Sequence, residues 1–271
     1  MIELVSYPVK GCAGVQLQES VLTQAGLAHD RSFMVIAEDG EFRTQRRAPK
    51  LAVVRPQVSA DGGSITLSAP GAEPVRIPVD LDAPRRDVLL FDKPFKGIDQ
   101  GELAAEWFSE VLGVPSRLVR VPPEHDRVSN GETPGTAGYA DSCAVLITSP
   151  PSLDLLNERI AESGGAPLPM NRFRANIVVD GWTRPHTEDR ARRIDIGGAE
   201  LGYAKLCLRC AVTMVDQSSG VPKGPEPIRT LSHYRRAFGG VAFGAKFAVT
   251  RPGRLAVGDE VHVTSWGESA A

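Results

Sequence analysis

The sequence predicts a mainly β (α+β) protein, an antiparallel β-barrel with helices packed on its outside. Short apolar or alternating runs, bounded by turn-forming residues, recur along the whole 271-residue chain. Only three longer segments carry helix signals. No internal repeat or low-complexity run is present. So many short strands favour a closed antiparallel sheet over an α/β arrangement.

The first half is expected to contain strands, two hairpins and one helix. Residues 32–37 run into Glu38-Asp39-Gly40-Glu41, whose Asp-Gly pair favours a hairpin turn, and Ala60-Asp61-Gly62-Gly63 joins a second hairpin. Gly101–Leu112 reads as a helix because its large apolar residues recur near i, i+4 and i+7. The Pro- and Gly-rich tract 122–138 is expected to be a flexible loop or an interdomain crossing. The remaining strands of this half are expected at 2–9, 52–59, 64–68, 75–79, 87–91 and 118–121.

The second half is expected to alternate strands with two helices. Thr148-Ser149-Pro150 is typical of a helix start, which predicts a helix over about 152–161. A second helix is expected over 226–238, where Leu231, Tyr234 and Phe238 share one side. A polar loop is expected to follow the strand 174–179 and to run as far as Arg193. The strands are expected at 144–147, 174–179, 199–205, 211–215, 247–249 and 260–263.

Composition narrows the class of protein. A net charge of −2 argues against a general nucleic-acid or anionic-membrane surface. Four scattered cysteines do not form a disulfide framework, so a reducing compartment is expected. The chain has no signal-peptide pattern and no run of eighteen apolar residues, which predicts a free cytoplasmic protein. P-loop, GxGxxG and GxSxG signatures are missing.

Cys207-Leu208-Arg209-Cys210 is the segment with the clearest chemistry. A thiolate favours thiophilic metals, and the neighbouring guanidinium of Arg209 lowers a thiol pKa. Two cysteines cannot close a structural site that needs four ligands, and no histidine lies at ligand spacing from them. These residues alone leave three readings open: a single reactive thiol, a redox pair, or core packing.

Around this segment the chain resembles the MOSC family, and within it the branch of the mitochondrial amidoxime-reducing component and its bacterial relatives. The resemblance covers nearly the whole chain in the same order. It is carried by Tyr7-Pro8-Val9-Lys10-Gly11-Cys12, Asp30–Val35, Asp99-Gln100-Gly101 leading into Trp107, Asn171–Val179, Cys207–Cys210, Val215-Asp216, Glu226-Pro227 and Gly258-Asp259.

The resemblance implies a MOSC β-barrel over residues 122–271, fused to a smaller N-terminal β domain over residues 1–121 that holds one helix. It implies a molybdenum cofactor (molybdopterin with Mo) whose metal is bound by Cys210, with Cys207 left as a packing residue. Asp141 is the second candidate catalytic residue, beside the metal. The implied cofactor-binding residues are Lys10, Gly11, Arg31, Ser142, Arg174, Asn176 and Arg209. Gly11 stands where animal members have serine, which removes one side-chain hydroxyl from that loop.

The implied activity is the reduction of N-hydroxylated compounds such as amidoximes and hydroxylamines. The chain lacks a cluster of four cysteines for a fused iron–sulfur centre, so its electrons would come from a separate protein of the ferredoxin, flavodoxin or cytochrome type. Two alternatives stay open: sulfur transfer through a persulfide on Cys210, and a non-catalytic carrier of the cofactor. Family descriptions also mention pyridoxal phosphate, but no lysine here has a Schiff-base context, so that cofactor would belong to a partner.

Overall fold

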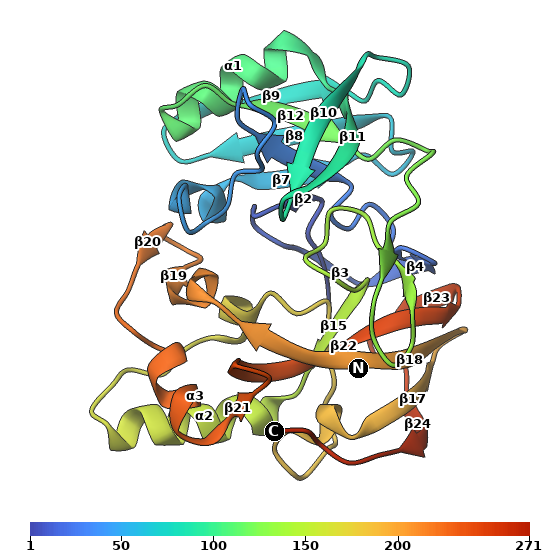
Figure 1. The fold of residues 1–271 in the computed structure, drawn as a ribbon, viewed down its shortest axis with the longest axis vertical. Coiled ribbons are helices and arrows are strands. Elements are labelled where there is room, and N and C mark those ends of the chain that lie inside the picture. The colour runs from blue at the N-terminus through green and yellow to red at the C-terminus, as the bar shows by residue number, and fades with distance from the viewer.

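The computed structural model describes residues 1–271 and confirms the mainly β class. Two groups of strands lie one above the other (Figure 1). The upper group carries helix α1, Gly101–Leu112, and the lower group carries α2, Pro150–Glu162, and α3, Ile228–Tyr234. None of the three helices combines the length and the apolar character needed to cross a bilayer.

The lower group is built on a curled nine-stranded sheet. Its order is β24-β17-β18-β22-β15-β16-β1-β3, with β21 paired to β22, and only β15 and β16 run parallel. Nineteen buried residues form its core, among them Tyr203 and Phe247. The bounds are β1 Glu3–Ser6, β3 Val15–Leu17, β15 Val145–Thr148, β16 Ile177–Val178, β17 Ala191–Ile196, β18 Ala199–Arg209, β21 Arg236–Ala237, β22 Gly240–Arg251 and β24 Val261–Trp266. The first strands of the chain therefore complete the sheet of its second half, and a division at residues 121/122 stays a prediction.

The upper group contains a five-stranded sheet, β10-β11-β12-β6-β2, and a three-stranded sheet, β7-β8-β9. Helix α1 has the predicted bounds, packs Trp107 and Phe108 into the core of this group, and ends at Gly113 with φ +73°. The hairpin around 60–63 is confirmed. The bounds are β2 Val9–Lys10, β6 Phe33–Ile36, β7 Arg55–Val58, β8 Ser64–Ala69, β9 Ala72–Pro78, β10 Arg85–Leu90, β11 Lys93–Asp99 and β12 Arg117–Arg120.

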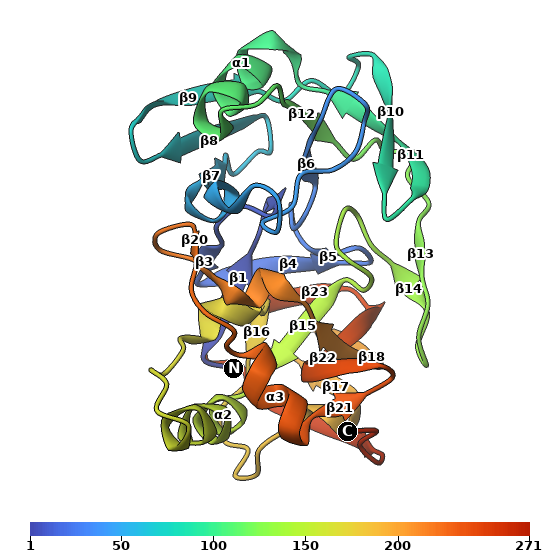
Figure 2. The ribbon, with the colours of Figure 1, turned by 60° about the vertical axis from the view of Figure 1, so that its left-hand side comes forward.

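Three further short sheets lie outside the upper group and the lower nine-stranded sheet: β23-β4-β5, β13-β14 and β19-β20. Strands β4 and β5, which form one of these sheets with β23, lie between the upper group and the lower sheet (Figure 2). The tract 122–138, predicted as a flexible loop, contains a small hairpin that packs on β18: the N–H groups of Glu132 and Thr133 donate to the carbonyls of Ala204 and Tyr203 at 2.9 and 3.0 Å. The bounds are β4 Glu19–Thr23, β5 Gly26–Leu27, β13 Val128–Ser129, β14 Gly135–Thr136, β19 Val215–Asp216, β20 Val221–Pro222 and β23 Gly253–Ala256.

Several predicted elements were wrong in type or extent. Residues 211–214 form a 3₁₀ helix rather than a strand, because both the N–H and the hydroxyl of Thr213 donate to the Cys210 carbonyl. The strand predicted over 174–179 shrinks to β16, because Arg174 has φ +56° and ends another 3₁₀ helix, Met170–Phe173. Residues 236–237 leave the predicted helix to pair with β22. The hairpin predicted at Gly40 forms but is short: Ile36 and Phe42 make an antiparallel bridge, while β6 itself pairs with β2 and β12.

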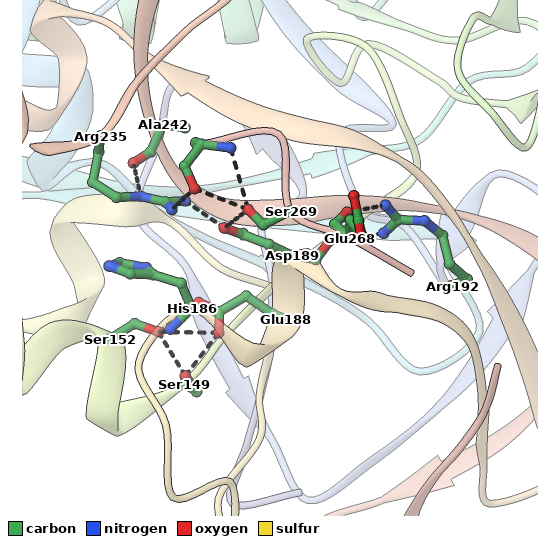
Figure 3. Close-up of polar contacts among 11 residues, drawn as sticks. Ser149, Ser152, His186, Glu188, Asp189, Arg192, Arg235, Ala242, Glu268 and Ser269 are labelled. Carbon is green, nitrogen blue, oxygen red and sulfur yellow. Dashed lines mark hydrogen bonds and ion pairs between the residues drawn. The ribbon is translucent and has the colours of Figure 1, made fainter. Parts of the chain in front are cut away.

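A buried polar network fastens α2 to the C-terminal end of the chain (Figure 3). The hydroxyls of Ser149 and Ser152 donate to the fully buried carboxyl of Glu188 at 2.9 and 2.8 Å. Beside it, Asp189 forms a buried ion pair of 2.5 Å with Arg235, which also donates to the carbonyl of Ala271. Burial, helped by the charge of Asp189, raises the pKa of Glu188 to about 7.

This raised pKa predicts that stability falls as pH rises from the unfolded pKa of 4.5 to about 7. In that window the folded protein holds a proton that the unfolded chain has released, and above it the full penalty persists. Glu188→Gln removes the titration, so the variant should match the wild type near pH 4 and exceed it by about 1–3 kcal/mol at pH 8. Urea unfolding at both pH values checks this. The exposed Glu158→Gln on α2 is the control, and an equal gain at both pH values would contradict the assignment.

Candidate functional site

A cleft of about 460 Å³ lies where the two groups of strands meet, and all nine predicted site residues line it. They come from segments far apart in the sequence: β2, the turn before β6, the loop before β15, the segment before β16, and the end of β18. The lining is strongly cationic. It contains one acid, Asp141, against eight basic residues: Lys10, Arg31, Arg43, Arg46, Arg174, Lys205, Arg209 and Lys246.

Arg31 and Arg174 form the buried part of this cationic lining. Each guanidinium lies 4.3 Å from the centre of the Tyr7 ring, so this one ring contacts two cations. Both arginines have left-handed backbones, with φ +46° and +56°, a conformation that costs energy and gathers at functional sites. Arg31 is paired with Asp30 at 2.6 Å, but Arg174 has no carboxylate partner and only donates to the Gln217 side chain at 3.2 Å. A buried guanidinium without an anion is costly, which favours an anionic ligand here.

Asn176 holds this arrangement in place. Its side-chain oxygen accepts hydrogen bonds from Arg31 and from the Leu146 N–H, and its amide donates to the Val5 carbonyl and to Asp30. Both amide protons are therefore used inside the protein. Asn176 lines the cleft but has no free donor for a ligand, so its position orients Arg31.

Lys10 and Asp141 form an ion pair at the mouth of the cleft. The Lys10 ammonium also donates to the Tyr139 carbonyl at 2.9 Å. Burial alone works to raise the pKa of Asp141, but the charges of Lys10 and Lys246 outweigh it and hold that pKa well below the usual range. The Asp141 side chain keeps 65% of its surface exposed, so solvent screens these charges. Ser142 accepts a hydrogen bond of 2.8 Å from Lys246.

The two cysteines of the C-x-R-C segment differ in access. Cys210 follows β18 directly and is exposed, whereas Cys207 is 3% exposed and packs among Leu146, Ala175 and Val178. Arg209 donates to the Cys207 sulfur at 2.7 Å and to the Phe173 carbonyl at 2.9 Å. Its Nε is buried and has no partner. Cys210 is therefore the thiol of this segment that a ligand in the cleft can reach.

A larger cavity of about 560 Å³ lies beside the cleft and contains none of the predicted site residues. Tyr7 lines this cavity, whereas Arg31 and Arg174 line the cleft. The larger cavity has one acid, Glu3, and one base, Arg55, and no cysteine. The smaller cleft combines a free thiol with clustered cations, and it is the candidate site for that reason.

Sequence reasoning missed three residues of this region: Tyr7, Lys205 and Lys246. The signal for the lysines was present, since each is the only charge within an apolar stretch of its strand, Leu201–Leu208 and Val241–Val249. Tyr7 was noticed only as part of a matching string. The contact of its ring with Arg31 and Arg174 depends on segments that are distant in the sequence.

Comparisons with known proteins identify the family of this chain. Residues 1–115 match the MOSC N-terminal beta barrel domain, and residues 134–262 match the MOSC domain. Mitochondrial amidoxime reducing component 2 of Rattus norvegicus is 32% identical over 94% of this chain and 80% of its own length. Mitochondrial amidoxime-reducing component 1 of Mus musculus is 32% identical over 96% and 81%. The molybdenum cofactor sulfurase of Danio rerio is 30% identical over 92% of this chain but only 32% of its own length.

Proposed function

Because the chain belongs to the MOSC family and aligns over most of its length with mitochondrial amidoxime-reducing components, we propose that it is a molybdenum-cofactor-dependent reductase of N-hydroxylated compounds. Amidoximes and hydroxylamines are the proposed substrate class. The electron donor is proposed to be a separate protein of the ferredoxin, flavodoxin or cytochrome type.

One observation carries the proposal: a single cleft joins an exposed thiol to a buried guanidinium, that of Arg174, which has no carboxylate partner. The molybdenum cofactor has a phosphate on its pterin and a metal that takes a thiolate. Arg174, 8% exposed and without a carboxylate partner, suits the phosphate, and the unpartnered Nε of Arg209 offers a further donor. Cys210 suits the metal. The donor set therefore fits this cofactor.

In the proposed complex, Cys210 holds the metal while Arg31, Arg174 and Lys10 hold the phosphate. Gly11, with φ +84°, keeps the loop after β2 free of a side chain. Ser142 and Arg209 supply hydrogen-bonding groups along the wall, and Asn176 fixes Arg31. When bound, the cofactor supplies the two-electron redox chemistry that removes oxygen from the substrate nitrogen.

The remaining chemistry belongs to Lys10 and Asp141. Because Asp141 is ionised at neutral pH, it accepts hydrogen bonds and can orient a water or a substrate N–H, but it is a weak proton donor. Lys10 carries the proton of the pair. Burial lowers the pKa of its ammonium group, although the charge of Asp141 opposes this shift. A proton for the departing oxygen would come from a water held by Asp141.

Two observations favour a second candidate, sulfur transfer through a persulfide on Cys210. Cys210 is an exposed thiol near an arginine, and molybdenum cofactor sulfurases are among the relatives. A carrier that delivers the cofactor without turnover would use the same cleft.

Turnover tests the reductase proposal against the carrier. Cofactor-loaded protein, given a chemical or enzymatic electron donor, is expected to convert benzamidoxime to benzamidine at least tenfold faster than cofactor-free protein does. Product is measured by chromatography. If fully molybdenum-loaded protein gives no product with several electron donors, the result would contradict the reductase proposal and favour the cofactor carrier.

A further inference from the structure

Two lysines stand directly opposite each other in the wall of the cleft. Lys205 of β18 is the cross-strand partner of Lys246 of β22, and both line the cleft and are half-buried. Directly opposed residues of an antiparallel pair point to the same face, about 5 Å apart at Cβ. Like charges in this position repel, so the pair is unfavourable unless an anion lies between them.

A β-bulge creates this pair. Tyr203 opposes Phe247, but the next pair is Lys205 with Lys246, so Ala204 is the extra residue of β18. Without the bulge, Ala204 would oppose Lys246, and Lys205 would point with Tyr203 toward the core. The hairpin β13–β14 covers the bulge, and a Cβ on Gly131 would lie 2.6 Å from the Ala204 carbonyl oxygen. The local irregularity therefore aims a second positive charge into the cleft.

Neither lysine forms an ion pair, although the charge of Lys246 also acts on Asp141. Lys205 makes no side-chain hydrogen bond or ion pair, and Lys246 donates only to the Ser142 hydroxyl. Asp141, the one acid of the cleft, is bound to Lys10. The pair comes from other elements than the two arginines: Arg31 and Arg174 contact the ring of Tyr7, whereas Lys205 and Lys246 belong to β18 and β22.

We infer that Lys205 and Lys246 form an anion-recognition subsite for the substrate. The preferred substrates then carry a carboxylate or a phosphate in addition to the N–O group. This inference rests on the proposed function and narrows its substrate class. The subsite lies beside Ser142 and lines the same cleft as the exposed Cys210, so one bound anion would satisfy both lysines while the N–O group faces the metal side.

Two matched substrate pairs test it, and each pair differs only in an anionic group. Benzamidoxime is compared with 4-carboxybenzamidoxime, and N4-hydroxycytidine with its 5′-monophosphate. The wild type should favour the anionic member of at least one pair by about tenfold or more in kcat/KM, and the pair that responds tells carboxylate from phosphate. Lys205→Met and Lys246→Met should each lower that preference about tenfold, Lys205→Arg should keep most of it, and the exposed Lys96→Met should not change it.

Binding provides a readout that does not need turnover. Calorimetry on cofactor-loaded protein should show 4-carboxybenzamide binding more tightly than benzamide, with the difference lost in Lys205→Met. Equal kcat/KM for charged and neutral substrates would overturn the inference while leaving the reductase intact. Loss of bound molybdenum in Lys205→Met would also overturn it, since the lysines would then serve the cofactor. If neither pair is reduced, the proposed function fails, and calorimetry still decides on the subsite.

Discussion

Replacing Cys210 by serine or alanine is expected to abolish N-reductive activity, a loss of at least about a thousandfold, while the fold stays intact. A serine oxygen does not reproduce the soft donation of a thiolate to the metal, and alanine offers no ligand. Because Cys210 is exposed and follows the last residue of β18, its removal leaves no cavity in the core. Activity with benzamidoxime, molybdenum content and thermal unfolding are measured together.

Cys207→Ala is the matched control, since it changes the other thiol of the same segment. The Cys207 sulfur is buried among Leu146, Ala175 and Val178 and accepts a hydrogen bond from Arg209. Its loss should cost about 1–2 kcal/mol of stability and leave most activity. Equal loss of activity in both variants, with both folded, would indicate a redox dithiol and contradict the single-ligand assignment.

Arg174→Met is expected to lower the affinity for the cofactor about ten- to hundredfold, because each charge-assisted hydrogen bond contributes about 1.5–3 kcal/mol. Arg174 has no carboxylate partner, so the substitution leaves no buried charge behind, and the fold should be at least as stable. Molybdenum and pterin per chain, measured after purification and dialysis, report retention. Unchanged retention would remove Arg174 from the phosphate site.

Arg31→Met should lose the cofactor to a similar degree but should also destabilise the fold. Its partner Asp30 is buried, and removing one member of a buried ion pair costs about 3–5 kcal/mol. Lys10→Met lies between these cases, because Asp141 is largely exposed. Arg76→Met, whose guanidinium only contacts Ser64, is the control and should change neither property.

The elements that the sequence predicted well are those decided by local pattern. Gly101–Leu112 was predicted to the residue because its apolar spacing and the following Gly113 agree. The segment after Cys210 was mistaken for a strand because Val212 and Thr213 favour strands, whereas a local hydrogen bond to the Cys210 carbonyl decides its conformation. Arg174 could not be placed correctly either, since nothing in its neighbours signals a left-handed backbone.

The candidate site, too, could be predicted only in part from the sequence. Family resemblance was enough to gather nine residues that line one cleft. It did not reveal that Asn176 uses its donors internally, or that the Tyr7 ring contacts two guanidinium groups. The lysine pair could not be predicted from the sequence, because a regular β18 would point Lys205 away from the cleft. Only the bulge at Ala204 turns its side chain toward the cleft.

The proposed function requires that the cleft holds a molybdenum cofactor through Cys210. Elemental analysis of purified protein, paired with the fluorescence of the oxidised pterin and an assay for sulfane sulfur, tests it most directly. We expect molybdenum and pterin near one per chain in the wild type, with molybdenum lost in Cys210→Ala. Protein without molybdenum or pterin, even after expression with abundant cofactor, and with sulfane sulfur on Cys210 would contradict the claim and support sulfur transfer.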